Sequence, residues 1–245
     1  MTITNAQSGT RVDEIAAGIY RISTPVPPTD IPGGFTFNQI LIVDDEPLLF
    51  HTGMRSLFPL VSQAVAHVLG DVAKLRYVSF SHVEADECGS LNQWLAAAPN
   101  ARAVFGQLGV NLSIGDMADR APLALADGEE LSLGKRRVRW LDTPHLPHNW
   151  ECGYMFEATT RTLLCGDLFT HGGHEVAPLT SGDIIGPAEG LRRAMPGSVA
   201  LEKNSRALLE KLASCEPTTL ALMHGSSYSG DGSRMLRGLA DAFGV

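Results

Sequence analysis

The sequence is poor in the features that mark membrane-bound and disulfide-stabilised proteins. No apolar run approaches the length of a membrane span, and the polar first eleven residues lack the apolar segment of a signal peptide. Cysteine occurs only 4 times in 245 residues, with no Cys-x-x-Cys pair and no spacing typical of a disulfide framework. These absences predict a soluble protein of a reduced, cytoplasmic compartment with no membrane partner.

Positive charge is also scarce. There are 19 Lys and Arg residues against 27 Asp and Glu residues, which gives a formal net charge of −8. The densest basic run, residues 135–139, lies beside an apolar strand-like stretch and is expected to face solvent. Neither glycine-rich phosphate-binding motif, Gly-x-x-x-x-Gly-Lys or Gly-x-Gly-x-x-Gly, is present. We therefore expect no nucleic-acid partner, because no basic cluster is available to neutralise phosphates.

Apolar residues make up 44% of the chain, which suits a full core in one globular domain over residues 1–245. Short strand-like runs alternate with segments of helical periodicity. Strands are predicted at 19–22, 37–43, 48–50, 75–80, 102–105, 138–141, 154–157, 162–165 and 218–223, and helices at 56–69, from 91 to before 99, at 201–212 and at 235–243. Two β-rich halves, each closed by helices, predict packed sheets with helices outside, an α/β layered fold.

Side chains that bind metals gather where the predicted strands end. The run from His82 to Glu87 places one histidine and three carboxylates between a buried strand and a helix. Further candidates follow three later strands, and the full set is His82, Glu84, Asp86, Glu87, His148, Asp167 and His224. Because layered α/β folds bind ligands at strand ends, we expect these side chains to form one site.

This pattern resembles the metallo-β-lactamase superfamily, and within it the metal domain of the flavodiiron proteins and the single-domain oxygen-binding di-iron proteins. The family pattern is His-x-Glu-x-Asp-His, then a distant His, an Asp and a last His. The chain carries the family residue type at six of these seven positions, over most of its length. Glu87 stands where the family has histidine, and His51 stands where an Asp-Thr-Gly motif is more usual. The stretch 37–43 is similar to the family's N-terminal strands.

The resemblance implies an αββα sandwich and a role for each candidate. His82, Glu84 and His148 would bind one metal ion, Asp86 and His224 the other, and Asp167 would bridge the two. For Glu87 two roles remain open, a metal ligand or a base beside the metals.

The residue types also bear on which metal binds. The hydrolytic branch of the superfamily has histidine where this chain has Glu84, so oxygen ligands here outnumber nitrogen ligands. Carboxylates are hard donors that suit iron or manganese, whereas zinc has no redox chemistry. Two iron ions are therefore predicted, with manganese or zinc as alternatives. If all four carboxylates bind, two divalent ions are neutralised, and oxidation of both leaves a charge that a bridging oxo, hydroxo or peroxo group would balance.

Three further residues have alternative interpretations. His145 competes with His148 as the ligand of the third loop, and the spacing to Asp167 favours His148. His171 either donates a hydrogen bond at the site or lies in a solvated loop. Tyr228 either donates a hydrogen bond to a metal-bound oxygen species or is structural. His171 and Tyr228 are thus the candidate catalytic residues beside the metals.

The resemblance further implies a function. We expect no flavodoxin-like domain in residues 1–245, so the first hypothesis is an oxygen-binding non-heme di-iron protein. It would sense dioxygen, or reduce dioxygen or nitric oxide with electrons from a separate redox or signalling partner protein, as a flavodiiron-type oxidoreductase. A homodimer is expected from the resemblance. The alternative is a binuclear metal-dependent hydrolase, and a weaker one is a metal-free scaffold for protein contacts.

Overall fold

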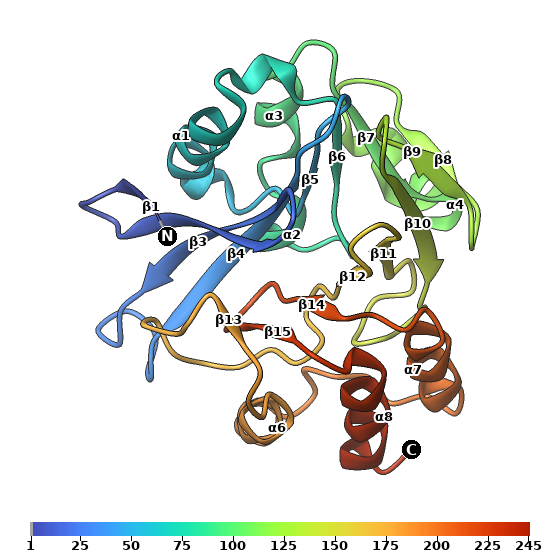
Figure 1. The fold of residues 1–245 in the computed structure, drawn as a ribbon. Helices are drawn as coiled ribbons and strands as arrows, with labels where there is room; N and C mark the ends of the chain where they lie inside the picture. Colours follow the sequence, from blue (N-terminus) through green and yellow to red (C-terminus); the bar gives the residue numbers. More distant parts are fainter. Residues whose placement is uncertain (1) are drawn as a thin grey trace.

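The computed structural model describes residues 2–245, in which two β-sheets pack together with helices on the outside (Figure 1). The first half of the chain builds an eight-stranded sheet in sequence order. Its strands are β1 (Thr2–Asn5), β2 (Thr10–Ala16), β3 (Ile19–Val26), β4 (Phe35–Ile42), β5 (Leu48–Phe50), β6 (Tyr77–Ser79), β7 (Arg102–Gly106) and β8 (Leu123–Leu125). Strands β1 to β5 are antiparallel neighbours, and β5 to β8 are parallel.

The second half builds a seven-stranded sheet in the order β13-β15-β14-β12-β11-β10-β9. Its strands are β9 (Glu130–Ser132), β10 (Arg137–Asp142), β11 (Gly153–Glu157), β12 (Thr162–Leu164), β13 (Leu179–Thr180), β14 (Thr219–Ala221) and β15 (Ser227–Ser229). The pairs β12/β14 and β13/β15 are parallel, and the other neighbours are antiparallel.

Helices cover the outer faces of both sheets (Figure 1). Those of the first half are α1 (Phe58–Leu69), α2 (Ala85–Cys88), α3 (Leu91–Ala97), α4 (Gln107–Gly109) and α5 (Gly115–Met117), with short 3-10 turns at Arg55–Leu57 and Val72–Lys74 and a π-helical turn at Val110–Ile114. Those of the second half are α6 (Ile185–Ala194), α7 (Ser205–Ala213) and α8 (Gly232–Phe243). No helix in residues 2–245 is long and apolar enough to cross a bilayer.

Helix α1 shows how the sequence sets a boundary. Its buried residues are Val61, Ala64, Val65 and Leu69, at the spacing of one helix face, and this face packs against β1, β2 and β3. Gly70 then takes a left-handed conformation, with φ of 80°, and its N–H donates to the Ala66 carbonyl. Glycine adopts this conformation at little cost, so the helix ends there as predicted.

Aromatic side chains join the two sheets at the core. Phe105 of β7 lies between Phe80 and Trp140, with ring centroids 4.8 Å and 4.9 Å away, and all three are fully buried. Phe80 and Phe105 come from the first sheet region and Trp140 comes from β10 of the second. This contact fixes how the two sheets sit against each other, and therefore how their strand ends meet.

All nine predicted strands and all four predicted helices are present, with shifted ends. The helix predicted at 201–212 begins only at Ser205, whose hydroxyl accepts a hydrogen bond from the Glu202 N–H, 2.8 Å away. The strand predicted at 218–223 ends at Ala221, because residues 222–226 turn toward the first sheet. Elements that the prediction missed are the strands β1, β2, β8, β9, β13 and β15, the helix α6 and the short helices α2, α4 and α5.

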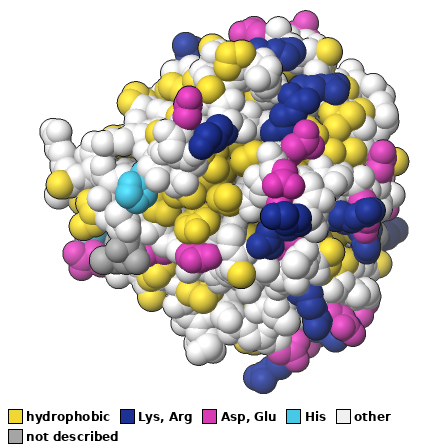
Figure 2. All heavy atoms as spheres, turned by 45° about the horizontal axis from the view of Figure 1, so that its top comes forward, with side chains coloured by type: hydrophobic (Ala, Val, Ile, Leu, Met, Phe, Trp, Pro, Cys, Tyr) yellow, Lys and Arg dark blue, Asp and Glu magenta, His cyan; other side chains and the backbone are white. Residues whose placement is uncertain are grey.

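The basic run at residues 135–139 is exposed in part and paired with acidic residues. Arg137 and Arg139 lie 3.6 Å and 2.9 Å from the Glu130 carboxylate on the neighbouring strand β9. On the face drawn in Figure 2, Lys and Arg side chains are interspersed with Asp and Glu around an apolar region. Such surface pairs contribute little to stability, and they leave this run without a strong uncompensated positive charge.

Asn38 of β4 ties the first sheet to the loop that follows β14. Its backbone N–H donates to the Met223 carbonyl at 2.9 Å, and its amide donates to the carbonyls of Leu222 and Gly225 at 3.0 Å and 3.1 Å. The side chain is fully buried. These bonds hold in place the loop that carries His224.

We expect Asn38→Ala to lower the free energy of unfolding of the metal-free protein by about 2 kcal/mol, because buried carbonyls lose their donor. Urea denaturation measures this difference. Asn111→Ala is the matched control, since Asn111 bonds only to Gln107 in an exposed position, and it should shift the value by less than about 0.5 kcal/mol. Equal effects of the two substitutions would contradict the role given to Asn38.

Candidate metal centre

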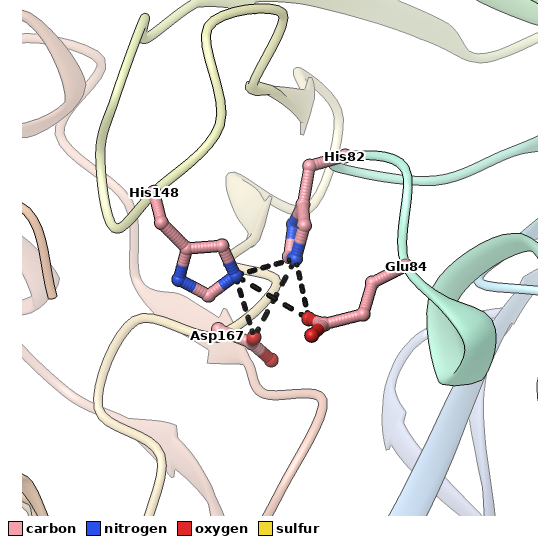
Figure 3. A group of neighbouring side chains, drawn as sticks. All are labelled: His82, Glu84, His148 and Asp167. Atoms are coloured by element: carbon pink, nitrogen blue, oxygen red, sulfur yellow. Dashed lines mark hydrogen bonds and ion pairs between the residues drawn. The ribbon is translucent and has the colours of Figure 1, made fainter. Parts of the chain in front are cut away.

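Four side chains from three separate loops converge at one end of the two sheets. They are His82, Glu84, His148 and Asp167, and each offers a ligand atom within 4.8 Å of the others (Figure 3). His82 and Glu84 follow β6, His148 follows β10, and Asp167 follows β12. Each loop therefore begins at the carboxyl end of its strand, as the sequence predicted for the whole set.

The centre of this cluster is narrow and lined by ligand atoms. The Nε2 atoms of His82 and His148 are 2.8 Å apart, with the two rings nearly perpendicular. Glu84 Oε2 lies 3.0 Å from the first and 3.3 Å from the second. Asp167 Oδ2 lies 3.8 Å and 3.9 Å from the same two nitrogens. All four side chains thus point at a common position (Figure 3).

The outer ring nitrogen of each histidine is engaged, which orients the inner nitrogen toward the site. His148 Nδ1 lies 3.0 Å from the Ser198 carbonyl, and His224 Nδ1 lies 2.8 Å from the Thr36 carbonyl. A carbonyl only accepts, so both Nδ1 atoms donate, and each Nε2 is turned toward the carboxylates of the site. His82 Nδ1 is 2.8 Å from the Ser81 hydroxyl. Metal-binding histidines are oriented by hydrogen bonds of this kind.

Asp167 connects this cluster to a second group of candidates. Its other oxygen, Oδ1, is 3.3 Å from His224 Nε2, and His224 Nε2 is in turn 3.4 Å from Asp86 Oδ2. One carboxylate oxygen therefore faces His82 and His148, and the other faces His224. Asp167 Oδ1 is buried and makes no hydrogen bond of normal geometry. Two cations, one on each side of Asp167, would satisfy these atoms, so the donor set fits a binuclear metal centre.

Opposite charges compensate one another throughout the site. Burial favours the neutral form of Asp167, but the nearby His224, together with His82 and His148, outweighs it and holds the pKa of that carboxyl at about 2. Burial alone would lower the pKa of His224, yet Asp167 and Asp86 raise it to about 10. Hydrogen bonds from His148 and His82 hold the pKa of Glu84 far below its usual range. The carboxylates therefore stay ionised, as a cation site requires.

Glu87 lies apart from the other candidates. Its side chain is fully buried, and Oε2 accepts a hydrogen bond from the Ser81 N–H at 2.9 Å and lies 3.0 Å from His51 Nε2. Its other oxygen is 3.7 Å from His82 Nδ1, the ring edge opposite the cluster. Of the seven residues in the predicted set, Glu87 is the one that the structure does not bring to the centre.

The two candidate catalytic residues also lie outside the cluster. His171 is buried, its Nδ1 donates to the Phe169 carbonyl at 2.9 Å, and its Nε2 accepts from the Ser226 N–H at 2.9 Å. Both ring nitrogens are used, so His171 braces the loop of His224. Tyr228 packs in the core of the second half, and its side chain is not part of the cleft described below. His145 is exposed, and His148 is the histidine of its loop that joins the cluster.

A cleft of about 490 Å³ opens beside the cluster, and its wall is mostly apolar. Phe35 stacks on the His224 ring, with centroids 4.3 Å apart, and Phe37 meets the same ring edge-on at 5.3 Å. Glu189 and Arg192 of α6 form an ion pair of 2.7 Å in the wall. This wall was not predicted from the sequence. The alternation of Phe35 and Phe37 along one strand was the available signal, because residues two apart share a face.

Comparisons with known proteins agree with the fold. The model of the ODP family beta lactamases matches residues 35–225. No curated protein sequence matches the chain. Among solved structures, rubredoxin oxygen:oxidoreductase from the anaerobe Desulfovibrio gigas is similar with a TM-score of 0.77 and 21% identity, over 95% of this chain and 62% of that one.

Two further solved structures show the same fold. The flavodiiron protein from Giardia intestinalis has a TM-score of 0.74 and 18% identity, over 94% of this chain and 58% of that one. A fragment, residues 1–254, of a Nostoc sp. PCC 7120 protein described as a diflavin flavoprotein has a TM-score of 0.81 and 17% identity, over 95% and 94% of the two chains.

This chain thus spans about 62% of the Desulfovibrio protein's length. The predicted metallo-β-lactamase fold, shared with flavodiiron cores, is confirmed. With the family model matching most of its length, the chain belongs to the ODP family of beta lactamases.

Proposed function

We propose that the chain is a non-heme di-iron protein that binds dioxygen or nitric oxide, and that His82, Glu84, Asp86, His148, Asp167 and His224 hold the two irons. The observation that carries the proposal is the position of Asp167. One of its oxygens faces the Nε2 atoms of His82 and His148, and the other faces His224 Nε2. A carboxylate placed between two groups of donors is suited to bridge two ions.

The donor types support iron. Glu84 Oε2, together with Asp86 and Asp167, brings hard oxygen donors to a site whose remaining donors are imidazole nitrogens. This mixture suits iron and manganese, whereas a set of histidines alone would suit zinc equally well. When bound, iron supplies the one-electron redox chemistry that dioxygen and nitric oxide require.

The protein's own residues would orient the ions and limit the access of water. Ser198 and Thr36 fix the rings of His148 and His224 through their carbonyls. Phe35 and Phe37 cover His224 from the cleft side. Small apolar gases partition into an apolar cleft more readily than ions do. If the protein reduces dioxygen or nitric oxide, we propose that the electrons come from a separate redox partner protein. If it senses dioxygen, we propose that a signalling partner protein responds to the bound gas.

We expect Asp167→Ala to remove iron from both positions, because each position loses a ligand. After anaerobic loading and desalting, elemental analysis should find about two irons per wild-type chain and less than about one in the variant. Asp116→Ala is the control, since Asp116 is exposed and distant in sequence from the cluster. Full iron content in Asp167→Ala would contradict the bridging role.

A pulse of dioxygen on the anaerobic, iron-loaded protein should produce a new visible absorption band of charge-transfer origin. Oxidised iron bound by oxygen ligands gives such bands, whereas the reduced form is nearly colourless. Stopped-flow spectroscopy measures the change, with Asp167→Ala as the negative control and nitric oxide as a second ligand. An unchanged spectrum in the protein that retains two irons would contradict the proposed function.

One observation favours a second candidate function. The cleft of about 490 Å³ is far larger than a diatomic gas needs, and it would admit an ester, thioester, lactone or phosphodiester. A binuclear hydrolase would use such a space. Turnover of these substrates by the zinc- or manganese-loaded protein would favour the hydrolase over the di-iron hypothesis, provided that Asp167→Ala abolishes this turnover.

A further inference from the structure

Two residues that depart from the family pattern touch each other inside the protein. His51 follows β5 and Glu87 lies in the run after β6, where the resemblance described above implies an aspartate and a histidine, respectively. In the structure His51 Nε2 lies 3.0 Å from Glu87 Oε2, and both side chains are fully buried. The carboxylate and the imidazole have therefore exchanged places between the two loops.

The backbone around this pair is held from both sides. The His51 N–H donates to the Ser79 carbonyl at 2.8 Å, and the Thr52 N–H donates to the Glu87 carbonyl at 2.7 Å. His51 has a φ of 68°, a left-handed conformation that a histidine adopts at a cost in energy. The Ser81 N–H donates to Glu87 Oε2, and His51 Nε2 lies 3.0 Å from the same oxygen. The Glu87 carboxylate is fixed in this direction.

The exchange must involve both residues together. An aspartate at position 51 beside Glu87 would bury two carboxylates next to each other, which is unfavourable. If position 87 kept the histidine while His51 stayed, two imidazoles would face each other with no carboxylate between them. The histidine at position 51 and the glutamate at position 87 therefore compensate for each other.

We propose that His51 is a positioning residue that keeps Glu87 out of the metal centre and behind His82. Glu87 Oε1 lies 3.7 Å from His82 Nδ1, while His82 Nε2 faces Glu84 and His148 on the opposite ring edge. The second metal ion would then be held by Asp86, Asp167 and His224. This inference rests on the proposed function in that it takes two cations to bind at these residues.

The existence of the exchanged pair is tested by a double-mutant cycle on the metal-free protein. H51D and E87H should each lower the urea midpoint, and H51D/E87H should recover more than about half of the summed loss. The exposed pair Glu210 and Arg237 is the control, and reversing either of its charges should shift the midpoint little. A double variant whose loss equals the sum of the single losses would overturn the pairing.

The position of Glu87 outside the metal centre is tested by calorimetric titration with Mn²⁺. E87Q keeps the size of the side chain and its acceptor for the Ser81 N–H, so it should still bind two Mn²⁺ ions, with the weaker dissociation constant changed less than about threefold. D86N should weaken one Mn²⁺ by more than about tenfold. If E87Q loses an ion as D86N does, Glu87 is a ligand and the proposal fails. If the wild-type protein binds fewer than two Mn²⁺ ions, the proposed function fails, while the metal-free cycle still decides whether the pair exists.

Discussion

A partly buried carboxylate, Asp167, which lies between His224 and the pair His82 and His148, is the constraint on which this structure depends. Asp167 Oδ1 is buried and makes no hydrogen bond of normal geometry, and Oδ2 faces two imidazoles that lie 2.8 Å apart. Such a group is stable only when positive charge surrounds it. Four loops therefore have to reach one place, and the arrangement of the sheets makes this possible.

The loops are held by bonds that cross from one sheet to the other. Asn38 and Arg21, both from the first sheet, donate to the Gly225 carbonyl beside His224 in the second half. Phe105 and Trp140 set the separation of the layers at the core. A shift of one sheet relative to the other would move His224 away from Asp86, which belongs to the first half. The packing of the core therefore determines the geometry of the metal centre.

The candidate ligands could be found from the sequence because their signal is local. A histidine or carboxylate directly after an apolar run is visible without knowledge of the fold, and the resemblance supplied their order. The direction of the Glu87 side chain could not be predicted from the sequence, because it depends on a contact with His51 in another loop. Helix α6 was missed since Gly186, Pro187 and Gly190 give it weak helix propensity, and the three-residue strands β8 and β9 are too short to show a period.

The position of Glu87 also changes the charge balance of the proposed centre. With all four carboxylates bound, two divalent ions would be neutral, but with Glu87 held by His51 only Glu84, Asp86 and Asp167 remain beside the ions. Two divalent cations would then exceed the three ligand carboxylates by one positive charge, which would favour an anion that enters from the cleft. A hydroxide would suit a hydrolase there as well as a di-iron protein. The distinction between the two functions therefore rests on Glu84, the hard donor that stands where the hydrolytic branch has histidine.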